Sequence, residues 1–120
     1  MGRHFRLYWL PVISWAILIF ILSSISRFPK QLEPVFSVDK LAHTIEYAIF
    51  GFLWARAFSN SQTENFKKFF RILAIICVIV YGITDEWHQS FVLYRTASVM
   101  DLLYDSLGGI IGQMFYRKIS

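Results

Sequence analysis

Four apolar segments alternate with short polar connections along the chain. The apolar segments cover about residues 7–26, 38–58, 69–91 and 98–116. Each is close to the roughly 20 residues that an α-helix needs to cross the hydrocarbon core of a bilayer. The pattern therefore predicts an all-α fold, a four-helix transmembrane bundle that forms a single domain over residues 1–120.

The composition supports a membrane protein rather than a soluble domain. Of the 120 residues, 56% are hydrophobic, and the mean hydropathy is +0.48, which is too apolar for a soluble domain of this size. The net charge of +4 is compatible with binding nucleic acid, but the basic residues stand at the ends of the apolar segments and form no stripe. We therefore expect no nucleic-acid partner. The single cysteine, Cys77, lies in an apolar run and excludes an internal disulfide.

The distribution of Lys and Arg predicts the orientation of the bundle. Eight of the 12 lie at the two termini and in or beside the second connection, and the other four lie in or beside the first and third connections. Because short cytoplasmic loops carry the excess of Lys and Arg, both termini are predicted to be cytoplasmic. We expect a multi-pass protein in which the start of the second helix, the end of the third and the start of the fourth lie at the outer side.

Polar residues repeat at helical spacing near these predicted outer ends. Residues three, four or seven positions apart share one face of a helix. One such face is predicted on each of the second, third and fourth helices. The residues on these faces are Asp39, His43, Tyr47 and Gly51, then Glu86 and Gln89, and then Asp101, Asp105, Gly108 and Gly112. Since the polar residues of the three faces lie at a similar predicted depth near the outer side, we expect them to meet in one polar pocket.

The predicted pocket contains more acid than fixed base. Six of the eight acidic residues fall in or beside it, against the fixed cations Lys40 and Arg95 and the titratable His43 and His88. Ionised groups are costly in a membrane interior and usually have a partner there. Either some carboxylates therefore stay protonated, or a cation or a cationic substrate completes the balance.

Three interpretations of this polar cluster remain open. In the first, the cluster is a structural network that ties three helices together. In the second, it is a site for a divalent cation, with Asp39, His43, Glu86 and Asp101 as candidate ligands. The metal is unknown, because carboxylates with one imidazole do not single out a metal. In the third, it is an acid/base site in which His43 beside Asp39 transfers protons and Arg95 holds an anion. The sequence contains no nucleophile elbow and no phosphate loop. If the protein is an outer-face membrane enzyme, the sequence therefore assigns it no reaction.

Two separated blocks of sequence carry specific spacings. The first reads D-K-x2-H-x3-Y-x3-G over residues 39–51, and the second reads E-x2-Q-x-F-x3-R-x2-S-x2-D-x3-D-x2-G-x3-G over residues 86–112. In residue type, spacing and order, both blocks resemble the VanZ-like family, which is named for a teicoplanin-resistance component. One position departs, because members of that family often carry Asn where this chain has Asp105. A second acid there argues against a purely neutral hydrogen-bonding role.

The resemblance implies a polytopic bacterial protein of the plasma (inner) membrane that is linked to antibiotic resistance. Combined with the pocket, it leads to the hypothesis that the protein binds, and in a stronger form also modifies, a membrane-linked or cell-surface substrate at the outer side. The expected partners are membrane lipid and a lipid-linked cell-wall precursor or another anionic head group. The alternatives are a non-catalytic membrane assembly or partner protein and a small transporter.

The residues of this hypothesis fall into three groups. The candidate catalytic residues are His43, Glu86 and Asp101. The candidate substrate-binding residues are Asp39, Lys40, Tyr47, Gln89, Arg95, Ser98 and Asp105. Close packing of helices is expected at Gly51, Gly108 and Gly112, because small residues let helix backbones approach each other in membranes.

Overall fold

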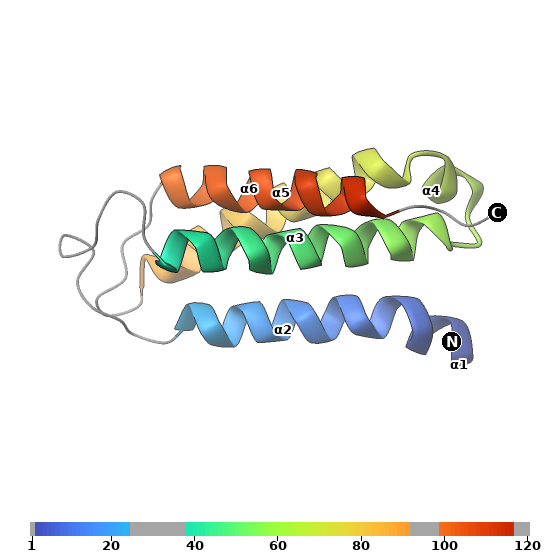
Figure 1. Ribbon diagram of the computed structural model, residues 1–120. Coiled ribbons are helices and arrows are strands. Elements are labelled where there is room, and N and C mark those ends of the chain that lie inside the picture. Colours follow the sequence, from blue (N-terminus) through green and yellow to red (C-terminus); the bar gives the residue numbers. More distant parts are fainter. Residues whose placement is uncertain (1, 25–37, 92–98, 117–120) are drawn as a thin grey trace.

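The computed structural model describes residues 2–24, 38–91 and 99–116 (Figure 1). Within these ranges the chain is helical and contains no strand, which confirms the predicted all-α class. The elements are α1 (Gly2–His4), the π-helical turn η1 (Phe5–Trp9), α2 (Leu10–Ser24), α3 (Val38–Ser59), α4 (Glu64–Lys68), α5 (Phe70–Gln89) and α6 (Val99–Phe115).

The connection between α3 and α5 contains a short helix, α4, where the sequence suggested a polar turn. Glu64 stands in its first turn, and Lys67 and Lys68 stand in its last turn. An acid near the start and bases near the end of a helix stabilise it through the helix dipole. The Lys67 ammonium also lies 2.9 Å from the Glu64 carboxylate, a pairing at a spacing that supports short helices.

The long helices α2, α3, α5 and α6 lie side by side, and the start of α1 and the end of α6 lie at the same end of the bundle (Figure 1). We call this the terminal end. The opposite end contains the start of α3, the end of α5 and the start of α6 (Figure 1), and we call it the site end. The polar faces predicted from the sequence belong to the site end.

Helices α3 and α6 pack so closely that glycine is needed between them. A Cβ atom added to Gly108 would lie 2.3 Å from the Thr44 carbonyl oxygen, and one added to Gly112 would lie 1.8 Å from the Ala48 carbonyl oxygen. Such approaches are far below van der Waals contact. The small residues therefore set the distance between the two backbones. Since Asp105 lies three positions before Gly108, the same face of α6 brings its carboxylate against α3.

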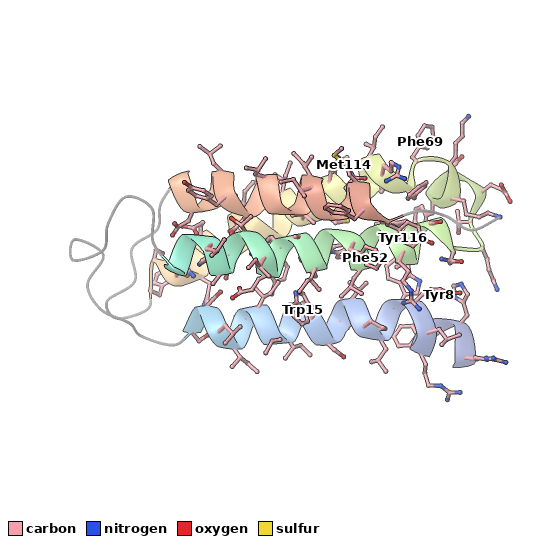
Figure 2. All side chains as sticks on the ribbon, in the orientation of Figure 1. Tyr8, Trp15, Phe52, Phe69, Met114 and Tyr116 are labelled. Carbon is pink, nitrogen blue, oxygen red and sulfur yellow. The ribbon has the colours of Figure 1, made fainter. Side chains whose placement is uncertain are left out.

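The bundle is apolar on the outside and polar inside at the site end. Large apolar side chains are exposed on every long helix, among them Ile17, Ile45, Ile76 and Leu107. Met114, which is 64% exposed, points away from the other helices (Figure 2). A core of aliphatic and aromatic side chains fills the interior of the bundle. Its buried members are Val12, Ile19, Tyr47, Phe50, Ala57 and Val78.

Among the described residues, one helical segment has the length and apolar composition to cross a membrane, Phe5–Ser24. The other long helices carry more charged residues, and many of these point inward. The prediction of four transmembrane helices therefore stays a prediction at this point.

Polar groups at the terminal end close the ends of helices. The Arg71 guanidinium donates hydrogen bonds to the carbonyl oxygens of Gln113, at 2.7 Å, and Tyr116, at 2.9 Å, at the end of α6. The Arg56 guanidinium donates to the Leu7 carbonyl oxygen at 2.6 Å. The bonds from Arg71 satisfy carbonyl groups that a helix end leaves without a partner, and the bond from Arg56 joins α3 to η1. The charges at this end thus have structural roles.

Candidate functional site

The site is built around a contact between α3 and α6. His43 Nδ1 lies 2.8 Å from Asp105 Oδ1, and the two side chains are 4% and 0% exposed. His43 lies on the second turn of α3, and Asp105 lies on the second turn of α6. The close approach of the two helices at Gly108 brings these side chains into hydrogen-bonding distance.

A second contact links α3 to α5. The Tyr47 hydroxyl donates a hydrogen bond to Asp85 Oδ2 at 3.0 Å. Tyr47 follows His43 by four residues, so both rings share one face of α3, and the rings lie nearly parallel with centroids 6.5 Å apart. His43, Asp85 and Asp105 each offer a ligand atom, and these three atoms lie within 4.8 Å of one another. Three helices therefore contribute to one cluster, which we call the His–Asp cluster.

More buried polar side chains surround the His–Asp cluster. Gln89 is completely buried one turn after Asp85 on α5, and within the described part of the chain neither atom of its amide has a hydrogen-bond partner. Oδ2 of Asp105 likewise has no hydrogen-bond partner among the described residues. Glu86 and Asp101 are also buried. Most buried polar groups in proteins are hydrogen-bonded, so Gln89 and Asp105 Oδ2 need an explanation.

A hollow beside Asp85 opens between α2 and α5. It has a volume of about 270 Å³ and is lined by Phe20, Tyr81, Thr84, Asp85, Trp87 and His88. His88 stacks on Phe20, and its Nε2 lies 2.8 Å from the Ser24 hydroxyl. A second hollow of about 370 Å³ shares Phe20 and Tyr81 with the first and is lined almost entirely by apolar side chains. Because Phe20 and Tyr81 line both hollows, the two lie next to each other on the side of the bundle, and one of them reaches Asp85.

The structure brings together several of the residues singled out from the sequence. His43, Tyr47 and Asp105 lie in or beside the His–Asp cluster, and Glu86, Gln89 and Asp101 are buried on the faces of α5 and α6. Other candidates lie outside the description. The side chains of Asp39 and Lys40, and all of Arg95 and Ser98, are outside the described residues.

The structure adds two features to the expected cluster. The sequence placed His43 beside Asp39 of the same helix, and the Asp39 side chain lies outside the described residues. The structure gives the imidazole a partner on another helix, Asp105 of α6. Asp85 was one of the six acids counted in or beside the predicted pocket but was given no catalytic, binding or metal-ligand role, although it belongs to the cluster. A signal for Asp85 was present, because Gly82, Asp85 and Gln89 are spaced at three and four positions and share one face of α5.

Two buried carboxylates and one imidazole define what this arrangement can do. Carboxylate oxygens accept hydrogen bonds and bind cations, and an imidazole is both a proton carrier and a metal ligand. Groups of this kind suit a cation, or a polar group that donates hydrogen bonds, better than an isolated anion.

Comparison with known families supports the resemblance seen in the sequence. The VanZ/LLP1 family model matches residues 5–120. The chain belongs to the VanZ/LLP1 family. Both motif blocks lie within the match, and the His–Asp cluster draws two of its residues from them. No curated protein and no solved structure matches the chain. VanZ proteins are typically membrane-associated, and the family name links them to glycopeptide resistance.

Proposed function

We propose that this VanZ/LLP1 protein is a multi-pass protein of the bacterial plasma membrane, with its long helices crossing the bilayer and both termini cytoplasmic. The pattern of exposure supports this topology, because each long helix presents large apolar side chains outward. Helix α3 has 22 residues and α5 has 20, and at 1.5 Å per residue such helices span the roughly 30 Å hydrocarbon core.

The charges support the cytoplasmic placement of the termini. Eight of the 12 Lys and Arg residues of the sequence belong to the termini or to the second connection and its flanks, and the other four belong to the first and third connections and their flanks. An excess of cations at one end of a membrane protein marks the cytoplasmic side. The site end, with its buried acids, would then lie near the outer surface.

In our proposal the site end binds a membrane-linked or cell-surface substrate and thereby lowers susceptibility to the glycopeptide teicoplanin. The observation that carries this proposal is the complete burial of the Gln89 amide, neither atom of which has a hydrogen-bond partner among the described residues. A buried polar group without a partner costs about 1–3 kcal/mol. A bundle that needed only stable packing would have apolar side chains there, so the cost is explained if a ligand supplies the missing partners.

The lateral hollows suggest how such a ligand reaches the site. The hollow lined almost entirely by apolar side chains lies between α2, α3 and α5, and the adjoining hollow ends at Asp85. An apolar chain fits the first environment and a polar head group fits the second. This arrangement favours an amphiphile that enters sideways from the membrane, as a lipid-linked cell-wall precursor would.

Susceptibility testing checks the proposal. The full chain is expressed in a teicoplanin-susceptible bacterial host, and the minimal inhibitory concentration is measured for the wild type and for His43→Gln, Asp85→Asn and Glu86→Gln. We expect the wild type to raise the inhibitory concentration and the three variants to lose most of that increase. His4→Gln and Glu64→Gln are matched controls far from the site, and both should keep it.

Protein levels in the membrane are measured by immunoblot for every variant. If the three site variants protect as well as the wild type at equal membrane levels, the site end has no role in resistance. Loss of protection in His4→Gln and Glu64→Gln at normal levels would equally contradict a role that is confined to the site end.

A further inference from the structure

We propose that His43, Asp85 and Asp105 bind one divalent transition-metal ion, of which Zn²⁺ and Mn²⁺ are the best examples. This inference concerns the same site as the proposed function and names its cofactor. It depends on the geometry of the His–Asp cluster and not on a role in resistance, so the two are tested separately.

The first argument is the distance between the candidate ligand atoms. The three atoms lie within 4.8 Å of one another and come from α3, α5 and α6. An ion at the centre of such a triangle would be at most roughly 2.8 Å from each atom, whereas metal bonds to imidazole nitrogen and carboxylate oxygen measure about 2.0–2.2 Å. Small rotations of the three side chains close this difference without any movement of the helices.

The second argument is the oxygen of Asp105 that lacks a partner. Asp105 is completely buried, and among the described residues Oδ2 has no hydrogen bond. This oxygen faces α5, because it lies 3.8 Å from the position that a Cβ atom of Gly82 would occupy. Gly82 precedes Asp85 by less than one turn, so Oδ2 is directed toward the helix that carries the other carboxylate. A metal ion between Asp105 and Asp85 would satisfy it.

The third argument is the balance of charge. Asp85 and Asp105 bring two carboxylates close together in the interior, and a divalent ion compensates both. The imidazole favours transition metals over Mg²⁺ and Ca²⁺, which prefer sites made of oxygen ligands alone. Three protein ligands also leave a coordination position free, as in metal sites that bind water or a substrate.

Tyr47 has a supporting role in this assignment. Its hydroxyl donates to Asp85 Oδ2 at 3.0 Å, which orients the carboxylate. Hydrogen-bond donors of this kind behind a metal ligand typically contribute 10- to 100-fold to metal affinity. Tyr47 is therefore a positioning residue and not itself a ligand.

Metal analysis of the purified full chain in detergent tests the inference. The protein is treated with a chelator, incubated with Zn²⁺, passed over a desalting column and measured by plasma mass spectrometry. We expect about one Zn²⁺ per wild-type chain and a small fraction of that in His43→Gln and Asp105→Asn. His4→Gln and Glu64→Gln, which change a histidine and a carboxylate at the terminal end, should bind as the wild type does.

Two further measurements separate ligation from folding. Tyr47→Phe should retain the stoichiometry but bind Zn²⁺ about tenfold or more weakly in a competition titration. Zn²⁺ should raise the melting temperature of the wild type, because a ligand that binds the folded state stabilises it, and should leave that of His43→Gln unchanged. Mg²⁺ should raise neither.

A wild-type protein that binds neither Zn²⁺ nor Mn²⁺ overturns the inference, whatever the variants do. Retention of one tightly bound ion by folded His43→Gln, as judged by circular dichroism, also overturns it. Resistance is scored independently. If the protein binds metal but the site variants protect as well as the wild type, the metal site is supported and the proposed function is refuted. If the protein binds no metal but the site variants lose protection, the proposed function is supported and the metal site is refuted.

Discussion

The His43 imidazole and the Asp105 carboxylate meet in the interior of the bundle, with Nδ1 2.8 Å from Oδ1. The two residues are separated by 62 positions in the chain. Their contact joins α3 to α6 close to the point where Gly108 lies against the Thr44 backbone. The same two helices thus provide both the tightest backbone contact that the glycines reveal and the central contact of the site.

Removal of one member of this pair should destabilise the protein strongly. In metal-free buffer, His43→Ala leaves a buried carboxylate without its partner, and the loss of one member of a buried pair costs about 3–5 kcal/mol. The double variant His43→Ala with Asp105→Ala should cost less than the sum of the single variants. Unfolding in detergent by increasing SDS, followed by circular dichroism, measures these free energies.

The matched control for this double-mutant cycle of His43 and Asp105 is His4→Ala. His4 Nε2 contacts the Asn60 carbonyl oxygen at 2.6 Å in a partly buried position, where a hydrogen bond contributes about 1 kcal/mol. If His43→Ala destabilises the protein no more than His4→Ala does, the buried pair contributes little to the fold. Strict additivity in the cycle would mean that the two side chains do not interact.

The glycines of α6 should differ sharply from Gly82 in their tolerance of alanine. A Cβ atom at Gly112 would lie 1.8 Å from a backbone carbonyl oxygen of α3, which cannot move unless the helices separate. We expect Gly112→Ala to destabilise the protein by about 3 kcal/mol, at the upper end of the usual cost of overpacking. The SDS unfolding assay measures the change.

Gly82→Ala is the control within the same bundle. Its Cβ atom would meet the end of the Leu102 side chain at 3.1 Å, and that side chain can rotate away. Alanine also favours the helix by about 1 kcal/mol over glycine, so the net effect should be within about 1 kcal/mol of zero. Equal destabilisation by the two substitutions would show that α3 and α6 are not held at the distance described.

Single cysteines should report the proposed orientation of the bundle. In a Cys77→Ala background, Phe91→Cys places a thiol at an exposed position of the site end, and Asn65→Cys places one at an exposed position of the terminal end. A membrane-impermeant maleimide should label Phe91→Cys in intact spheroplasts and Asn65→Cys only after permeabilisation, because the basic end is cytoplasmic. The reverse pattern would show the opposite orientation.

Much of the architecture followed from local patterns. Apolar runs separated by polar connections predicted the all-α class, and the two motif blocks pointed to the family that the match over residues 5–120 confirms. Helical spacing also placed His43 with Tyr47 on one face and Asp101 with Asp105 on another. The short helix α4 was not predicted, because its five residues form only one turn and depend on local charge pairing.

The sequence by itself determined which side chains share a face of each helix, because helical periodicity depends only on residues a few positions apart. Only the tertiary structure decided which faces meet. It gave His43 a partner on α6, and it placed Asp85 beside Tyr47 on a helix 38 residues away. The physical reason is that the rotation and separation of neighbouring helices follow from the contact of Gly108 and Gly112 with the α3 backbone, and no local pattern specifies that contact.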